Sequence, residues 1–301
     1  MRIPLDLIRN QRPVLLPIML PALIGMFICR AHLVSVHGQT RSVVFAVSGS
    51  GAEGSMDAVV AHRRQSNCAR RTTSEKEDAQ KKFGEQYFAA GKVYRLIFGG
   101  GEAGTVKVDK WNVGCNNIHA QVTTTTSAKL GGKVMALATS STTLGKRSVS
   151  RRPPTDAERT AVLALMKSIY QQKRTPTTLM SQIKVSNLTA TDLDGDGKYE
   201  MIGSFTLAAK NKFERDLFLI AKPQGDKFVA DFVKLQAYQP PPEEFLSSID
   251  YIEQLDLDGN GTGEVFAQQG GFDGYALLVF KKVAGRWRQV HDYDRRCVLR
   301  S

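Results

Sequence analysis

Two acidic, glycine-containing segments constrain the fold of this 301-residue chain more than any other feature. The first reads DLDGDGKYE from Asp192 to Glu200, and the second reads DLDGNGTGE from Asp256 to Glu264. Both fit one pattern, D-x-D-x-[DN]-G-x-x-E, and their first residues lie 64 positions apart (256 − 192). A pattern that recurs at such a spacing predicts that the chain forms the same loop twice, within two copies of one structural unit.

The residue types in these segments predict cation binding. Oxygen-bearing side chains at positions 1, 3, 5 and 9 can converge on one ion if the chain curls, and the glycine at position 6 permits the tight turn. Hard oxygen ligands without His or Cys favour calcium over zinc or copper. We therefore expect two Ca²⁺ sites, each completed by a backbone carbonyl at position 7: Asp192, Asp194, Asp196, Lys198 and Glu200 in the first, and Asp256, Asp258, Asn260, Thr262 and Glu264 in the second. The first loop has four carboxylates and the second has three, so we expect the first to bind more tightly.

An EF-hand would also use an acidic loop of this kind, but it requires a bidentate glutamate at position 12. Position 12 is Gly203 in the first segment and Ala267 in the second. The residues that follow both loops have the pattern of strands, whereas an EF-hand loop continues into a helix. The pattern therefore excludes an EF-hand.

Beyond residue 184 the sequence indicates β-structure, with hairpin turns at KPQGDK and KVAGR. Over about residues 186–295 the two loops resemble those of FG-GAP and VCBS-type repeats, which are calcium-bearing β units. The resemblance implies side-chain ligands at positions 1, 3, 5 and 9 and a loop that joins strands of a propeller blade. Two copies are fewer than the 4–8 blades of a closed propeller. We expect a mainly β fold with a minor α part, in which antiparallel units resembling blades of an incomplete propeller follow a small β/α region.

The N-terminal residues predict export. A basic leader precedes an apolar run, PVLLPIMLPALIGMFIC, which Pro17 and Pro21 interrupt and which is short for a membrane span. This favours a secretory signal and an extracytoplasmic location, periplasmic, secreted or at the cell surface. An uncleaved anchor and an N-terminal extension remain open as alternatives. The expected divisions are a signal peptide or anchor at 1–33, a disordered linker at 34–87, a small sheet plus helix at 88–183, and the two calcium-loop units at 184–301.

Local patterns place the elements of the second and third divisions. Residues 34–80 lack a sustained apolar pattern and are rich in small and charged residues, which is typical of a linker. Short β-type runs separated by glycines predict a small antiparallel sheet over about 90–140. Thr155 and Glu158 form a capping box ahead of an apolar stripe, which predicts a packed helix at 155–172.

The positive charge of the chain lies mainly in its middle. Residues 81–175 carry 16 basic and 5 acidic side chains, or +11 of the net +12. No aromatic ladder interleaves with them, and no basic helix carries base-reading side chains, so specific nucleic-acid binding is not expected. The segment is interpreted as a solvated basic face, with an anionic surface as the alternative partner.

The cysteines, at positions 29, 68, 115 and 297, include no C-x-x-C pair. This spacing excludes a zinc site of the usual kind and leaves a single disulfide open.

The sequence contains no persuasive catalytic constellation. GGGEAG (Gly99–Gly104) precedes a strand pattern rather than a helix, so it indicates a hairpin turn and not a dinucleotide site. His119 and His291 lack partners in the pattern, and the adjacent Glu243 and Glu244 point apart in an extended segment. We therefore expect a non-enzymatic, calcium-stabilised binding or structural module with a protein or polysaccharide ligand at the cell surface, touching the membrane only through an uncleaved N-terminus. The alternatives are a calcium-stabilised hydrolase and a protein that binds anionic surfaces.

Overall fold

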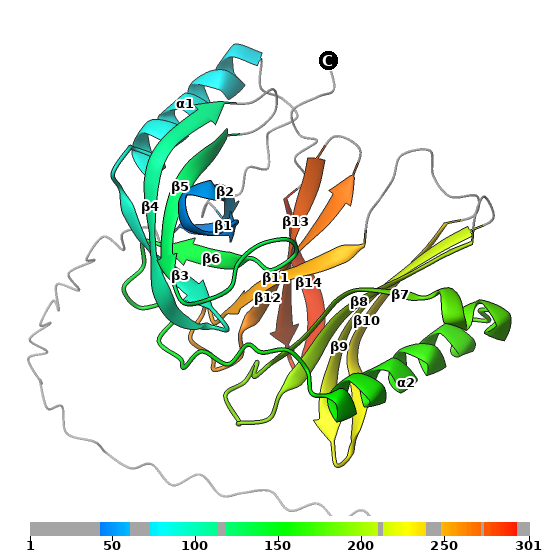
Figure 1. The fold of residues 1–301 in the computed structure, drawn as a ribbon. Helices are drawn as coiled ribbons and strands as arrows, with labels where there is room; N and C mark the ends of the chain where they lie inside the picture. The colour runs from blue at the N-terminus through cyan, green and yellow to red at the C-terminus, as the bar shows by residue number, and fades with distance from the viewer. Residues whose placement is uncertain are drawn as a thin grey trace, which may run out of the picture. The chain divides into compact units, whose positions relative to one another are not determined.

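The described part of the chain consists of three antiparallel β assemblies. The structure is a computed structural model and describes residues 43–60, 73–113, 118–209, 213–238, 248–271 and 274–293. These residues form a closed six-stranded barrel and two four-stranded sheets (Figure 1). The predicted mainly β fold is confirmed. The leader, all four cysteines and the Glu243–Glu244 pair lie outside the described residues.

The barrel has the strand order β1-β2-β5-β4-β3-β6 and closes through antiparallel pairing of β1 with β6. Its strands are β1 (Val44–Ser48), β2 (Gly54–Val60), β3 (Val93–Phe98), β4 (Gly101–Val113), β5 (Ile118–Thr126) and β6 (Ala136–Thr139), with a 3-10 turn at Gly51–Glu53. Helix α1 (Thr73–Tyr87) contributes Phe83 and Tyr87 to the barrel core. The ring of Phe45 lies at the centre of this core, 5.0 Å from the ring of Tyr94 and 5.4 Å from that of Phe88. The barrel is therefore filled by side chains.

The linker predicted at residues 34–87 is wrong for the residues that the structure describes there. Strands β1 and β2 belong to the barrel, and α1 packs on it. The sheet expected at 90–140 therefore also contains two strands from the segment predicted to be a linker. The physical reason is that β1 is buried on both faces. Phe45 and Val47 point into the barrel, while Val44 and Ala46 pack against the second sheet. A five-residue strand buried on both faces has no alternating pattern by which it could be recognised.

The two four-stranded sheets have the same architecture. The first comprises β7 (Lys184–Thr191), β8 (Glu200–Ala209), β9 (Phe213–Gln224) and β10 (Lys227–Tyr238). The second comprises β11 (Ile249–Leu255), β12 (Glu264–Gly271), β13 (Gly274–Val283) and β14 (Arg286–Tyr293). In both, consecutive strands pair in antiparallel register, so each sheet is a meander. The acidic segment connects the first strand to the second strand in each case.

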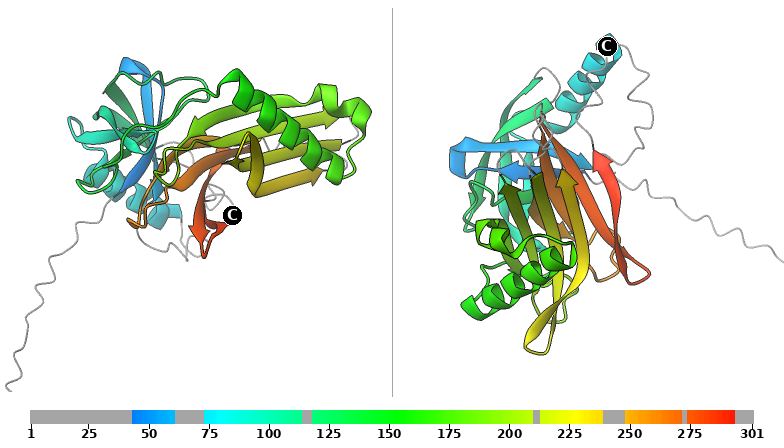
Figure 2. Two further views of the ribbon diagram at one scale, coloured as in Figure 1. Left: turned by 90° about the horizontal axis from the view of Figure 1, so that it is seen from below. Right: turned by 90° about the vertical axis from the view of Figure 1, so that its right-hand side faces the viewer.

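Three apolar interfaces stack the elements as layers. Helix α2 (Asp156–Gln172) covers one face of the first sheet through Val162, Met166 and Tyr170 (Figure 2). The opposite face of the first sheet packs on the second sheet, and the second sheet packs on the barrel. Among the described residues, the second sheet shares a hydrophobic core with the barrel, and the first sheet shares its cores with α2 and with the second sheet. Each sheet buries both faces, as stacked blades do, and propeller closure is not shown.

The helix and the turns agree with the sequence. Helix α2 begins after Thr155, whose hydroxyl accepts from the Glu158 N–H while the Glu158 carboxylate accepts from the Thr155 N–H, which confirms the capping box. The short helical turn Thr177–Gln182 follows. GGGEAG provides the β3–β4 turn at Gly99 and Gly100 and the first four residues of β4. The β13–β14 hairpin turns at Ala284 and Gly285, both with positive φ. Among the described helices, none has the length and apolarity needed to span a bilayer.

One acidic pair interrupts the apolar interface between the two sheets. Glu214 and Asp216 lie two residues apart on β9, so both side chains point toward the second sheet. Asp216 is 3% exposed, and its Oδ1 accepts a hydrogen bond from the Thr206 hydroxyl at 2.7 Å. Burial, together with the charge of Asp216, raises the pKa of Glu214 to about 7. The pair therefore holds a proton at pH values where ordinary glutamates have lost theirs.

We expect this pair to make folding stability fall as pH rises. The folded-state pKa of Glu214 exceeds its unfolded value, so its stabilising contribution is complete below about pH 4.5 and is lost as pH rises through about 7. The check is thermal unfolding between pH 5 and 8, compared for the wild type, Glu214→Gln and the exposed control Glu85→Gln. Glu214→Gln should lose less stability than the wild type over this range, and Glu85→Gln should follow the wild type. Parallel curves for all three proteins would contradict the prediction.

Candidate metal centre

Each acidic segment is a corner between the first two strands of its sheet. Asp192 and Asp256 follow directly after β7 and β11, and Glu200 and Glu264 are the first residues of β8 and β12. The two ends of each loop are therefore held by adjacent, hydrogen-bonded strands. This anchoring fixes positions 1 and 9 before any ion binds.

Backbone hydrogen bonds fold the first loop around its own carboxylates. Asp192 accepts from the Gly195 N–H at 2.7 Å and from the Gly197 N–H at 3.0 Å. Glu200 Oε2 accepts from the Leu193 N–H at 2.9 Å. Gly195 and Gly197 both have positive φ, which side chains disfavour and which the curl of the loop requires.

The second loop has a similar set of bonds, except that Asp256 accepts from the N–H of position 5 where Asp192 accepts from the N–H of position 4. Asp256 accepts from the Asn260 N–H at 3.1 Å and from the Gly261 N–H at 3.0 Å, and Glu264 Oε2 accepts from the Leu257 N–H at 2.8 Å. The glycines at positions 4 and 6, Gly259 and Gly261, again have positive φ. Two segments of similar sequence thus adopt similar loops, which share the bonds from positions 2 and 6 and the positive φ of both glycines.

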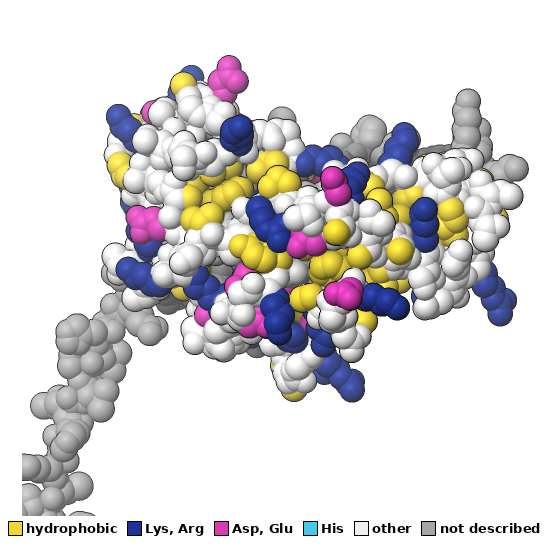
Figure 3. Space-filling model, turned by 60° about the horizontal axis from the view of Figure 1, so that its bottom comes forward, with side chains coloured by type: hydrophobic (Ala, Val, Ile, Leu, Met, Phe, Trp, Pro, Cys, Tyr) yellow, Lys and Arg dark blue, Asp and Glu magenta, His cyan; other side chains and the backbone are white. Residues whose placement is uncertain are grey.

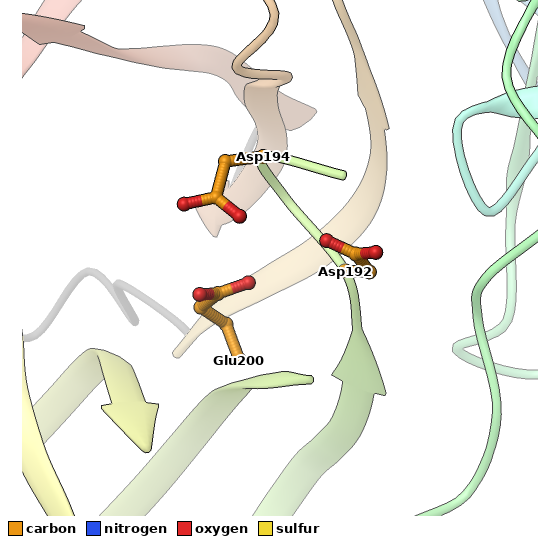
Figure 4. A group of neighbouring side chains, drawn as sticks. All are labelled: Asp192, Asp194 and Glu200. Carbon is orange, nitrogen blue, oxygen red and sulfur yellow. The ribbon is translucent and has the colours of Figure 1, made fainter. Parts of the chain in front are cut away.

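The carboxylates at positions 1, 3 and 9 converge in both loops. One carboxylate oxygen from each of Asp192, Asp194 and Glu200 lies within 4.8 Å of the other two. The same holds for the second group, which comprises Asp256, Asp258 and Glu264. Figure 4 shows the three side chains of the first group gathered at the loop. Glu200 and Glu264 are buried, whereas Asp194 and Asp258 are exposed, so each group is open to solvent on one side. Each group could hold a metal ion.

The structure does not bring the carboxylate of Asp196 into the first group, whereas the Asn260 side-chain amide donates to Asp258, a member of the second group, at 3.1 Å. Asp196 Oδ1 accepts from the Lys198 N–H at 2.7 Å, and Asn260 Oδ1 accepts from the Thr262 N–H at 2.8 Å. The Lys198 ammonium lies 3.6 Å from the Asp196 carboxylate and is well exposed. These side chains therefore shape the turn, and the roles of Asp196, Asn260 and the carbonyls of Lys198 and Thr262 as ligands stay predictions.

The first group gathers negative charge without an ion-pair partner among the described residues. Burial, followed by the charges of Asp194 and Asp192, raises the pKa of Glu200 to about 7. In the described parts of the chain, no ion pair joins a Lys or Arg to any of these three carboxylates. Like charges held this close favour either a proton or a cation between them.

The second group differs because a lysine enters it. The Lys281 ammonium, from β13, lies 2.5 Å from Asp258 Oδ2 and 3.0 Å from Glu264 Oε1. Hydrogen bonding from Lys281 lowers the pKa of Asp258, and the same bond raises the pKa of Lys281. The second group is therefore already partly neutralised within the protein.

The two loops are also in direct contact. The Gly263 N–H, in the second loop, donates to the Leu193 carbonyl of the first at 2.7 Å. The Arg147 guanidinium donates to the Leu193 carbonyl at 2.9 Å and also to the Gly261 carbonyl. Arg147 thus places a positive charge beside both loops and fixes their spacing.

A buried glutamine supports the same corner. Gln254 Nε2 donates to the Asp192 carbonyl at 3.0 Å and to the Thr191 hydroxyl at 2.7 Å. A Cβ at Gly263 would lie 2.6 Å from Gln254 Oε1, so a side chain there would require Gln254 to move. The backbone at position 8 of the second loop therefore passes directly over Gln254.

Sequence reasoning missed Arg147, Gln254 and Lys281. Arg147 belongs to the basic run GKRSVSRRPP (residues 145–154), which is part of the segment 81–175 that the sequence predicts to be a solvated basic face. In the structure, Arg147, Arg151 and Arg152 all make internal hydrogen bonds. The contact of Lys281 with the second loop follows from the pairing register of β12 and β13. Val265 pairs with Phe280, which places Lys281 opposite Glu264, but that register is not visible before the strands are assembled.

The surface and the comparisons with known proteins do not identify a partner. On the face drawn in Figure 3, basic and acidic side chains are interspersed, with hydrophobic patches between them. Comparison with protein-family models, curated proteins and solved structures finds no match for this chain.

Proposed function

We propose that this chain is an extracytoplasmic calcium-binding β protein of the FG-GAP or VCBS type, in which calcium fixes the corners of two stacked sheets. The observation that carries the proposal is the first carboxylate group. Three convergent carboxylates, one of them buried, have no cationic partner among the described residues. Oxygen ligands on a loop that is open to solvent on one side fit Ca²⁺, which accepts irregular geometry and several waters.

The ions would act as structural elements rather than as catalysts. Each loop joins two paired strands whose faces are buried against neighbouring layers. A cation that neutralises the loop stabilises the corner and, through it, the stacking. A ligand that binds only the folded state stabilises it by RT ln(1 + [Ca²⁺]/Kd), which is about 2.7 kcal/mol at a hundredfold excess over Kd. Such a scaffold would serve binding of a protein or polysaccharide at the cell surface.

Calcium binding is tested by calorimetric titration paired with melting curves. We expect heat on addition of millimolar calcium and a rise in melting temperature that a chelator reverses. Asp194→Asn should weaken binding at the first loop by about tenfold, because ligand charge tunes affinity. This variant suits the test because no loop N–H bonds to the Asp194 side chain, so the loop geometry is retained.

The matched control is Asp226→Asn, the same change in an exposed hairpin turn of the first sheet. It should leave both the titration and the melting curve as in the wild type. Absence of heat and of any melting shift with the wild-type chain would refute the proposal. An equal loss in both variants would show that the effect is general electrostatics and not ligation.

A further inference from the structure

The second carboxylate group contains an internal cation that the first group lacks, although both sheets carry a lysine at the same register position. Met201 pairs with Ala221 in the first sheet, so Lys222 lies opposite Glu200. Val265 pairs with Phe280 in the second sheet, so Lys281 lies opposite Glu264. The two meanders therefore present equivalent lysines to equivalent loops.

The two lysines nevertheless have different partners. Lys222 lies 3.7 Å from Asp231 of β10, and its side chain is 50% exposed. Lys281 contacts Asp258 and Glu264 at 2.5 and 3.0 Å, and its side chain is 27% exposed. Glu264 has both oxygens engaged, one by Lys281 and the other by the Leu257 N–H. The Lys281 ammonium thus contacts two of the three carboxylates that a metal ion at this loop would have to bind.

The geometry points to Lys281 as a tethered competitor of calcium: its ammonium closes the second loop at low calcium and leaves it when the ion binds. This inference rests on the proposed calcium function and adds a regulatory difference between the two loops. The first loop would fill first, and the second would respond only at higher calcium. Lys281 can leave because part of its side chain already reaches solvent, and Asp258, at 40% exposed, gives the ion an entry path.

Competition makes a prediction with a definite sign. Removing the Lys281 charge should raise the affinity of the second loop for calcium, although the change deletes two ion pairs. An increase of about tenfold or more is expected, because a unit charge about 4 Å from another interacts appreciably even near a protein surface. If Lys281 only supported the structure of the loop, its removal would lower the affinity of the second loop for calcium.

The experiment is calorimetric titration with calcium chloride on the full chain, in an Asp194→Asn background that weakens the first loop. In this background Lys281→Met should bind calcium at the second loop about tenfold more tightly than the parent. Lys281→Arg keeps the charge and should stay near the parent. Lys222→Met removes the register-equivalent lysine and should also stay near the parent.

Unfolding in chelator provides a second measurement. Lys281→Met should be less stable than the parent without calcium, because Glu264 loses its counter-charge, and saturating calcium should close that gap. Unchanged or weaker second-loop affinity in Lys281→Met overturns the inference even when the first loop of the wild type binds calcium. If neither the wild type nor Lys281→Met binds calcium at either loop, the proposed function fails together with it.

Discussion

Replacing Arg151 with methionine is expected to lower the free energy of unfolding by about 3–5 kcal/mol, because it leaves a buried carboxylate without its partner. Arg151 lies 3.1 Å from Glu253, and their side chains are 4% and 0% exposed. The guanidinium also donates to the Met135 and Ile252 carbonyls. The residue therefore joins the barrel to the second sheet at a position that water does not reach.

Two aromatic rings complete the surroundings of this pair. The Arg151 guanidinium lies 4.9 Å from the centre of the Phe98 ring and 4.7 Å from that of Tyr251. The Tyr251 hydroxyl and the Gln254 N–H both donate to Glu253 Oε1, so the carboxylate is fully hydrogen-bonded as well as paired. Desolvation of both charges is offset only while all of these partners are present.

Denaturant unfolding at pH 7 measures the effect, and two further variants make it specific. Arg151→Met combined with Glu253→Leu should recover much of the loss, because an apolar pair leaves no buried charge. Glu102→Gln breaks the pair between Arg95 and the Glu102 carboxylate, which is 51% exposed, and should cost far less stability than Arg151→Met. If Arg151→Met cost as little as Glu102→Gln, the pair would not be holding the layers together.

Truncating Phe45 to alanine should be comparably damaging, at about 3–5 kcal/mol, because the cavity would lie at the centre of the barrel core. Phe45 is fully buried, and the rings of Phe83, Tyr87, Phe88 and Tyr94 surround it. The same change would have almost no effect if residues around it formed a linker. The variant therefore distinguishes the structure from the interpretation of the sequence.

Denaturant unfolding again provides the measurement, with Val93→Ala as the control. Val93 lies on barrel strand β3 but is 58% exposed, so its truncation should change stability by no more than about 0.5 kcal/mol. Equal and small effects for the two variants would mean that β1 contributes nothing to the folded core.

The parts of the fold that could be predicted are those with local signals. Thr155 and Glu158 stand three residues apart ahead of an apolar stripe, and helix α2 begins there. Glycines with positive φ mark the corners of the acidic loops and the β3–β4 turn. The carboxylates at positions 1, 3 and 9 could be selected in advance because the tight curl that brings them together is encoded by the glycines beside them.

The parts that could not be predicted depend on contacts between distant residues. The burial of Arg151 is one case. Its ion-pair partner, Glu253, lies 102 residues away in the sequence, so nothing near Arg151 indicates that it is buried. The position 5 residues are another. Asp196 and Asn260 suit ligation equally well by residue type, and only the folded loop shows that both bond to backbone N–H groups.

By itself, the sequence determined the local geometry: two matched acidic loops, the strands that flank them, and the capped helix, because turns, caps and alternation act over a few residues. The tertiary structure alone decided that β1 and β2 close a barrel, that α2 covers the first sheet, and that Lys281 enters one loop while Lys222 turns to Asp231. Burial on both faces erases the alternating pattern of a strand, and a charge has no defined partner until strands are in register. Those two physical facts explain why the loops could be recognised in advance and the difference between them could not.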